Sequence, residues 1–271
     1  MFIGWIRKNS FSTDLEALNE KMTIDKSLIL KTYEENSSLC FGIYDENNLV
    51  AFISAYELEK SFLINNFYYL DEIDDDIKKR LIKLLLENIN DDKKPILIMS
   101  KKDERKLFSS LEFKEFSKFK RALYSGGGVA FNFTNATAKS ISNENFLPIM
   151  TSIDKVAFEE DKTPYTKNIL LKQSSLVLST QSGYQHSYAI NKSLIKISPW
   201  IMRDAAFSDA EKMIRGIIYH RGLKKIFAYV PSEVKEITDL YESYKFDMSE
   251  EYTLFYKNSK PPINLEMIYA F

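Results

Sequence analysis

Residues 38–70, SLCFGIYDENNLVAFISAYELEKSFLINNFYYL, decide the fold class. The stretch contains three apolar runs, Ser38–Tyr44, Leu49–Glu57 and Phe62–Leu70, and each run has the composition of a β-strand. Short polar segments separate the runs and have the composition of turns. The stretch therefore predicts an antiparallel meander of three strands.

A helix and a further strand follow the meander. Apolar residues recur at helical spacing from Ile73 to Leu85, which predicts an amphipathic helix over about residues 72–89. The next expected elements are a strand at Pro95–Met99, a short helix at Asp103–Ser110 and a strand at Lys114–Tyr124. One or two short helices are expected upstream, between Asp14 and Glu34. The first half of the chain is thus predicted to have the order β-β-β-α-β-α-β.

The same order returns in the second half of the chain. The expected helices are Glu144–Phe158, Pro164–Lys172, Ser208–Arg221 and Glu233–Tyr244, and the expected strands are Leu176–Thr180, Tyr184–Ile190, Leu194–Ser198, Lys225–Val230 and Glu251–Tyr256. Two copies of one unit are the natural explanation, because the order and spacing of the elements repeat. We therefore predict an α/β (α+β) protein with two domains, residues 1–133 and 134–271, each a mixed sheet with a leading antiparallel meander and flanking helices. Asn132–Asn143 has the composition of a linker.

Composition excludes several classes of function. The 37 Lys and Arg residues nearly balance the 38 Asp and Glu residues, so the net charge of −1 gives no general attraction for nucleic acid or acidic lipid. Three of the 8 glycines stand together at 126–128, and no stretch of the sequence can form a glycine-rich phosphate-binding loop of the P-loop or GxGxxG type. With two histidines and one cysteine, a zinc cluster or a disulfide framework is excluded. No leader and no apolar run of 18 residues is recognised, so we expect no membrane span and a cytoplasmic location.

The second half of the chain carries phrases that resemble a known family. They are Ser152–Phe158 followed by Asp161-Lys162, then Ser198-Pro199-Trp200, Val230-Pro231, Leu240–Phe246 and Ile268–Phe271. Together with the repeated order of elements, they make nearly the whole chain similar to a bacterial tandem pair of GNAT N-acetyltransferase domains with degenerate coenzyme A motifs. The resemblance implies that acetyl-CoA binds where two central strands splay apart, and that an aromatic strand closes the second domain.

The resemblance also implies where the pyrophosphate would bind. The family signature, Gln/Arg-x-x-Gly-x-Gly/Ala at a helix N-terminus, is matched weakly by Arg203, Ala206, Phe207 and Ser208. The alternative is that Ser208 and Glu211 form a capping box for a helix that binds no ligand. The equivalent stretch of the first domain, residues 70–76, has five carboxylates and no glycine, and these acids would compete with a phosphate.

Two catalytic roles follow from the resemblance. Tyr241 takes the position of the proton donor for the thiolate, whereas the first domain has Phe108 there, which has no proton to give. Glu57, with Glu59 as an alternative, is the candidate general base near the end of a middle strand. Tyr241 and Glu57 each have a simpler interpretation, as a packing residue and as a solvated charge beside a turn.

Two functional hypotheses result. The first is an acetyl-CoA-dependent N-acetyltransferase that acts on an amine of a small molecule or peptide. The second is a catalytically inactive GNAT-fold module that binds a ligand or a protein. We expect no metal and no covalent chemistry at His186, His220 or Cys40, because so few scattered ligands cannot form a site. A homodimer remains among the assemblies that the sequence allows.

Overall fold

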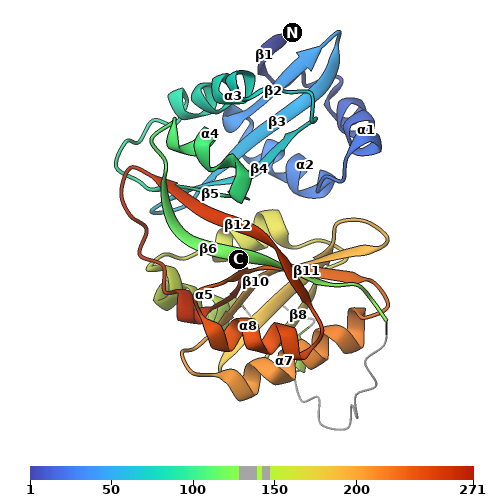
Figure 1. The fold of residues 1–271 in the computed structure, drawn as a ribbon, viewed down its shortest axis with the longest axis vertical. Helices are drawn as coiled ribbons and strands as arrows, with labels where there is room; N and C mark the ends of the chain where they lie inside the picture. The colour runs from blue at the N-terminus through green and yellow to red at the C-terminus, as the bar shows by residue number, and fades with distance from the viewer. Residues whose placement is uncertain (128–138, 142–146) are drawn as a thin grey trace. The chain divides into compact units, whose positions relative to one another are not determined.

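The computed structural model describes residues 1–127, 139–141 and 147–271 (Figure 1). The chain divides into two compact units. Unit 1 consists of Met1–Phe116 and Leu254–Pro261, and unit 2 of Ser117–Thr253 and Pro262–Phe271. The predicted domain boundary after residue 133 lies outside the described residues, and so does the predicted linker except for residues 139–141. Each unit takes a short segment from the other half of the sequence.

Unit 1 begins with the predicted meander. Its elements are β1 (Phe2–Trp5), α1 (Phe11–Lys21), α2 (Lys26–Glu35), β2 (Cys40–Asp45), β3 (Asn48–Glu57), β4 (Phe62–Tyr69), α3 (Asp75–Glu87), β5 (Ile96–Lys101) and α4 (Arg105–Ser109). Strands β1 to β4 pair antiparallel in chain order, whereas β5 pairs parallel with β4. The sheet is therefore mixed, as the sequence predicts.

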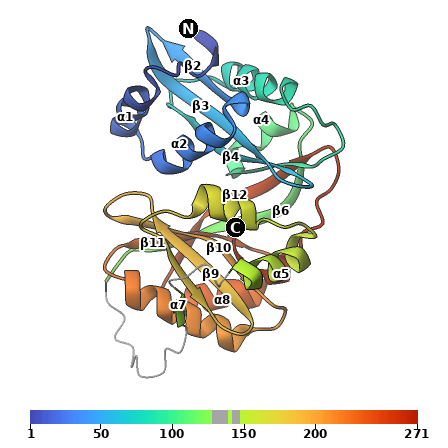
Figure 2. The ribbon, with the colours of Figure 1, turned by 180° about the vertical axis from the view of Figure 1, so that it is seen from behind.

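Helix α3 shows how the sequence positions an element of unit 1. The Asp74 carboxylate accepts a hydrogen bond from the Ile77 N–H at 2.9 Å, so the helix begins at Asp75 rather than at residue 72. Leu81 and Leu85 lie one turn apart and are fully buried against the sheet. The opposite face of the sheet is covered by α1 and α2, with Leu15 in their shared core (Figures 1 and 2).

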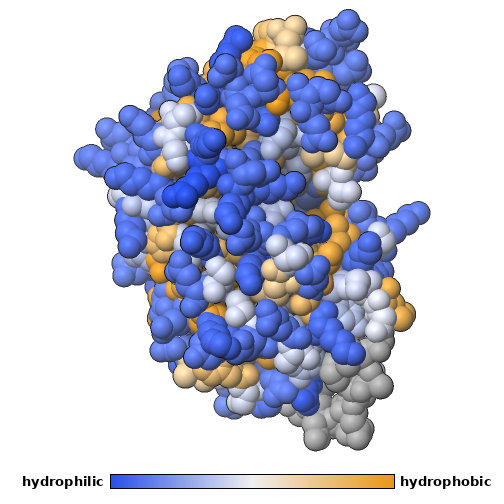
Figure 3. All heavy atoms as spheres, viewed as in Figure 1, coloured by the Kyte–Doolittle hydropathy of each residue, from blue (hydrophilic) through white to orange (hydrophobic). Residues whose placement is uncertain are grey.

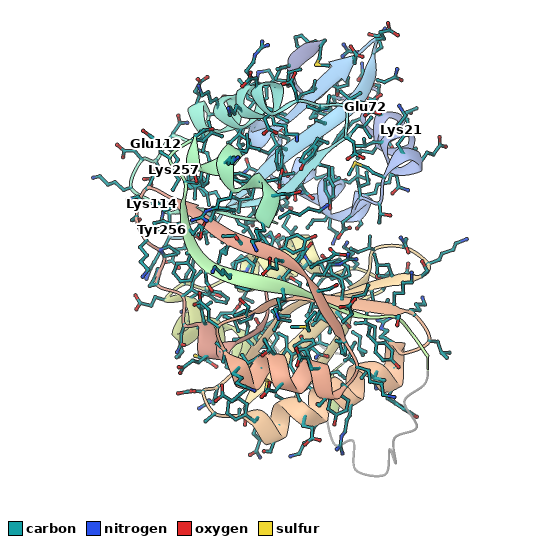
Figure 4. The ribbon with its side chains drawn as sticks, viewed as in Figure 1. Lys21, Glu72, Glu112, Lys114, Tyr256 and Lys257 are labelled. Carbon is teal, nitrogen blue, oxygen red and sulfur yellow. The ribbon has the colours of Figure 1, made fainter. Side chains whose placement is uncertain are left out.

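The end of β12 (Asp247–Lys257) completes the sheet of unit 1, where it is the neighbour of β5 in strand order. Its Phe255 ring is completely buried and stacks on Phe108 at a centroid distance of 5.0 Å. The Lys257 ammonium donates to the Leu111 carbonyl at 2.9 Å and pairs with the Glu112 carboxylate at 2.8 Å (Figure 4). A segment from the end of the sequence thus contributes both core and ion-pair contacts to unit 1.

Unit 2 repeats the pattern of pairing. Its elements are β6 (Lys114–Tyr124), β7 (Lys139–Ile141), α5 (Leu147–Phe158), α6 (Thr163–Tyr165), β8 (Leu176–Ser179), β9 (Gly183–Ala189), β10 (Leu194–Met202), α7 (Phe207–Arg221), β11 (Lys225–Pro231), α8 (Lys235–Ser243) and β13 (Ile268–Ala270), with the first part of β12. Strands β8, β9 and β10 form an antiparallel meander, and β11 pairs parallel with β10. Strand β6 pairs antiparallel with β11. The predicted α/β class, a mixed sheet with flanking helices, is confirmed.

The surface seen in Figure 3 is largely hydrophilic, with small separate apolar patches. Trp5 and Phe2 on the edge strand β1 are about half exposed, and Leu223 after α7 is fully exposed. Single exposed apolar side chains are common on monomeric proteins. The homodimer stays a prediction.

Candidate functional site

Each unit contains a pair of parallel strands, and in both units the two strands separate part of the way along their length. In unit 1 the pairing of β4 with β5 ends at Ile64 and Ile98, and β4 has a bulge at Asn65. In unit 2 the pairing of β10 with β11 ends at Lys196 and Phe227, and the register with β9 shifts just beyond. A bulge bends its strand away from a neighbour. Each unit therefore has a splay between two parallel strands.

Strand β13 fills the splay of unit 2. It pairs antiparallel with β10, where Ala270 is opposite Trp200 and Ile268 is opposite Ile201. On its other side, the Phe271 N–H donates to the Tyr229 carbonyl of β11 at 2.9 Å. Strand β13 is completely buried. The chain's own backbone thus occupies the space that opens between β10 and β11.

Tyr241 of α8 points its hydroxyl at this strand. The side chain is completely buried, and its hydroxyl donates to the Tyr269 carbonyl at 2.9 Å. Its ring contacts the Trp200 ring at a centroid distance of 5.7 Å. Burial raises the pKa of Tyr241 well above its usual value, with a smaller contribution from Tyr269. The hydroxyl therefore remains protonated and is directed at whatever lies in the splay.

Helix α7 begins beside the same strand. Ala206 is its N-cap and offers no side-chain acceptor to the first turn. Phe207 is partly exposed, and its ring lies 6.5 Å from the Tyr269 ring. Arg203 and Ser208 are exposed. The four residues predicted to bind pyrophosphate thus lie together at one end of the splay of unit 2.

Solved structures with the same arrangement of elements identify the fold. A putative acetyltransferase from Pyrococcus horikoshii superposes with a TM-score of 0.74 at 14% identity, over 100% of this chain and 93% of that chain. A GCN5-related N-acetyltransferase from Sphaerobacter thermophilus gives a TM-score of 0.62 at 10% identity, over 98% of each chain. The chain has the GNAT fold.

A third structure with the GNAT fold is a tandem GNAT protein from the clavulanic acid biosynthesis pathway. It gives a TM-score of 0.58 at 5% identity, over 94% of this chain and 97% of that chain. No family model matches the sequence, and no curated protein matches it either. At these identities the likeness concerns the fold alone.

The predicted capping box of this GNAT fold is wrong. Helix α7 begins at Phe207, so Ser208 is already inside the first turn and no side chain caps it. Glu211 instead accepts hydrogen bonds from Arg215 at 2.6 Å and from the Tyr244 hydroxyl at 2.8 Å. A guanidinium one turn further along the helix competes successfully for the carboxylate.

The corresponding region of unit 1 has different chemistry. The side chain of Asp74 caps α3, and Asp75 and Asp76 follow in its first turn, so carboxylates already occupy the positive end of this helix. At the splay, the Tyr69 hydroxyl donates to Glu104 at 2.5 Å, and Ser100 donates to the same carboxylate. In unit 1, hydrogen bonds between side chains thus connect the two separated strands, whereas in unit 2 the strand β13 lies between them. No motif in the sequence marks the contact between Tyr69, Ser100 and Glu104, so it could not be predicted.

Glu57 lies away from this bridge in the same unit. It ends β3 beside the turn to β4, and its carboxylate pairs with the Lys94 ammonium at 2.8 Å. Tyr241 belongs to unit 2, so the two predicted catalytic residues are in different units. Phe108, at the corresponding position in unit 1, is completely buried and packs against the rings of Phe113 and Phe255.

A buried ionisable cluster lies on the α5 face of unit 2. Asp154 is completely buried, accepts a hydrogen bond from the Tyr184 hydroxyl at 2.5 Å, and has no hydrogen-bond partner for its second oxygen among the described residues. Burial raises its pKa to about 7. The Lys162 ammonium lies 3.5 Å from the centre of the Phe158 ring and 5.3 Å from that of Phe271. In the sequence, Asp154, Phe158 and Lys162 are only parts of phrases that resemble a family, and the structure brings them together.

The residues expected to carry no metal are dispersed. His186 is buried, with its ring nitrogens 2.6 Å from the Ser198 carbonyl and 2.8 Å from the Ser175 hydroxyl, and burial lowers its pKa to about 4. Cys40 is buried and its pKa is raised to about 12. Among the described residues, no three His, Cys, Asp or Glu side chains are grouped as metal ligands. No helix in the described part of the chain is long and apolar enough to cross a bilayer.

Proposed function

We propose that this protein is an acetyl-CoA-dependent N-acetyltransferase made of two GNAT-like halves, and that the reaction takes place in the splay of unit 2. The acceptor is an amine of a small molecule or a peptide. The observation that carries the proposal is the Tyr241 hydroxyl, which is buried, protonated and 2.9 Å from the backbone carbonyl of the strand in the splay. A proton donor directed at this position is what a departing thiolate requires.

The backbone in the splay supports the choice of ligand. Strand β13 is extended and pairs through its peptide groups with β10. The pantetheine arm of coenzyme A is also an extended chain with amide groups, so it can pair with the same edge of β10. The free edge of a strand binds any extended chain that presents amide donors and acceptors.

The phosphates would bind at the start of α7. The backbone N–H groups of Phe207 and Ser208 lie at the positive end of a helix whose N-cap residue, Ala206, has no side-chain acceptor. Arg203 is exposed in the preceding loop and adds a positive charge. Asp209 in the first turn is partly neutralised by Lys212, whose ammonium lies 2.8 Å from its carboxylate. Unit 1 does not fit the same group, since the Asp74 side chain already caps α3.

The proposed reaction is a direct transfer. The amine nitrogen attacks the thioester carbonyl, a C–N bond forms and the C–S bond breaks, and the thiolate takes its proton from Tyr241. The amine proton passes to water, because β10 and β11 carry no carboxylate. Tyr241 then regains a proton from solvent. Glu57 has no part in this scheme, because its carboxylate is paired with the Lys94 ammonium.

Turnover with a panel of primary amines, measured by mass spectrometry of the products, tests this proposal. Tyr241→Phe should lower kcat by about 10²-fold or more while acetyl-CoA binding is retained. Tyr219→Phe is the matched control, because Tyr219 lies on the exposed side of α7 and should leave turnover unchanged. Equal kcat for Tyr241→Phe and the parent protein would contradict the role of Tyr241.

The inactive GNAT-fold module is the second candidate function. The observation that favours it is the pairing of β13 with both edges of the splay, which leaves the sheet of unit 2 continuous. This candidate requires that acetyl-CoA does not bind even when β13 is loosened. Calorimetry on the variants described below separates the two candidates.

A further inference from the structure

We infer that β13 and acetyl-CoA compete for one groove, so that β13 must leave the β10 edge before the ligand binds. This inference rests on the proposed function and adds its regulation. The groove is the splay between β10 and β11, with Trp200 on its β10 side and Tyr241 on α8. The closed protein is then the resting form, in which the chain occupies its own binding site.

Strand β13 is held to the sheet by few backbone contacts. It is three residues long, and its register with β10 shifts between Trp200 and Ile201. Only short runs of backbone pairing connect it to the sheet, and Pro261 and Pro262 precede it in the connection from β12. Prolines cannot extend a strand's pairing, because they lack the N–H group. A short strand on such a connection can detach without unfolding the rest of the sheet.

The closed form leaves several buried polar groups without hydrogen-bond partners. The Trp200 indole N–H and the Tyr269 hydroxyl are buried and have no hydrogen-bond partner among the described residues. Gln185, which is opposite Trp200 on β9, is completely buried, and neither atom of its amide has a partner there. Buried polar groups without partners destabilise a structure. The closed form is therefore less stable than its dense packing suggests.

The unpaired polar groups of Trp200 and Gln185 can form the hydrogen bonds that the proposed ligand offers. Trp200 can donate to a carbonyl, and Gln185 can both donate and accept. The pantetheine arm has amide carbonyls, amide N–H groups and a hydroxyl, whereas no side chain of β13 forms a hydrogen bond with Trp200 or Gln185. We therefore assign Trp200, which is opposite Ala270 of β13, as a positioning residue that binds the arm when β13 leaves.

A contact on the α5 face of the sheet holds the closed form. The Phe271 ring, which directly follows β13, lies near the Phe158 ring at 6.4 Å and near the Phe119 ring at 5.9 Å. The Lys162 ammonium faces both the Phe158 and the Phe271 rings. Phe271 is only partly buried, so its truncation should loosen β13 without emptying a core position.

A reversible lock tests the competition. Ile201→Cys and Ile268→Cys place two thiols at directly opposite positions of β10 and β13, within the range that a disulfide spans. Cys40 is buried and does not interfere. Calorimetry with acetyl-CoA should show binding to the reduced double variant and a loss of about 100-fold or more after oxidation. Each single cysteine variant is a control that should bind equally before and after oxidation.

Two further variants should change the affinity for acetyl-CoA in opposite directions. Phe271→Ala should bind acetyl-CoA about tenfold more tightly than the parent protein, because it weakens the closed form. Gln185→Leu should bind more weakly, and it should unfold at a higher denaturant concentration, because it removes two unpaired polar atoms. In a Trp5→Phe background, Trp200 is the sole tryptophan, and its emission should shift when acetyl-CoA displaces β13.

The outcomes separate the two proposals. Equal binding by the oxidised and reduced double variants overturns the competition but leaves the acetyltransferase standing. No binding by the parent, by Phe271→Ala or by the reduced double variant overturns the acetyltransferase and the competition together, and supports the inactive module. Acetyl-CoA binding that appears when the disulfide of the double variant is reduced, and also in Phe271→Ala, supports both proposals.

Discussion

The methyl side chain of Ala206 affects both the stability of α7 and the binding of an anion at its start. As the N-cap of α7 it leaves the first turn without a side-chain acceptor, which weakens the helix but keeps the turn free for an anion. We predict that Ala206→Asp raises the free energy of unfolding by about 1 kcal/mol, because the carboxylate caps the helix. The same carboxylate should weaken acetyl-CoA binding to the Phe271→Ala protein by about tenfold or more. Urea denaturation and calorimetry measure the two effects.

Ala206→Ser is the matched control for this prediction, because serine caps the helix without adding a charge. It should be stabilised like the aspartate variant and should bind acetyl-CoA more tightly than that variant does. Equal binding by both variants would mean that the phosphates do not approach α7.

Asp154 makes stability depend on pH. Its pKa is raised to about 7 by burial, and Tyr184, Lys162 and Asp161 are the ionisable groups that act on it. The folded state therefore binds a proton that the unfolded state has lost between about pH 4 and pH 7. As a result, the contribution of Asp154 to the free energy of unfolding falls as the pH rises through that window, by about 1.4 kcal/mol for each pH unit. We predict that Asp154→Asn removes this fall.

Urea denaturation of both proteins at several values between pH 4 and pH 8 measures the difference. The gain in stability of Asp154→Asn over the parent should grow with pH and should level off above pH 7. A constant difference across the range would mean that Asp154 is ionised throughout.

At the scale of the residue, the sequence predicted less than at any other scale. It placed Arg203, Ala206, Phe207 and Ser208 at one helix start, and the structure confirms that start to within a residue. The alternative prediction of a capping box at Ser208 and Glu211 was wrong, because Glu211 binds two partners from outside the local motif and no side chain caps the helix. Nor does any spacing reveal that Trp200 and Gln185 lack partners, since that depends on packing between distant strands.

At the scale of the element, β13 allows a comparison of two tyrosines. The Tyr241 hydroxyl has a partner and the Tyr269 hydroxyl has none among the described residues, although both are buried. We predict that Tyr241→Phe lowers the free energy of unfolding by about 1 kcal/mol, whereas Tyr269→Phe leaves it unchanged or raises it. Denaturant titration of the two variants checks this pair. A loss of equal size in both would mean that Tyr269 has a partner in solution.

The regular elements could be predicted because their signal is local. The apolar runs of β2 to β4 and the helical spacing in α3 both come from contiguous residues, and both predictions are confirmed. The four residues at 268–271 were recognised as an aromatic strand, but not as an occupant of the splay. Four residues have no pattern that selects β10 over another edge, and the choice is made by the bulge that opens β10 from β11.

At the scale of the whole molecule, the exchange of strands makes each unit dependent on both halves of the sequence. Unit 1 needs residues 254–261, and their Phe255 fills the space beside Phe108. We predict that a fragment of residues 1–127 does not unfold cooperatively, because loss of a buried phenylalanine alone costs about 3–5 kcal/mol. Circular dichroism during heating measures cooperativity.

The control for the fragment is a chain in which a Gly/Ser linker joins residues 1–127 to residues 247–261. This chain should regain a cooperative transition, whereas the same linker followed by a scrambled 247–261 segment should not. A cooperative transition in the bare fragment would show that unit 1 is complete without the exchanged strand.

The exchanged strand is synthesised late, so during translation the nascent protein waits for the segment that pairs with β5. Roughly 140 residues separate Phe116 from Leu254, so a ribosome that adds 5–20 residues per second needs about 7–30 s to deliver the segment that β5 awaits. Throughout that interval the edge of β5 presents unpaired peptide groups, which are a template for aggregation. We therefore expect the N-terminal half of this protein to be open to aggregation during every round of translation, however stable the finished molecule is.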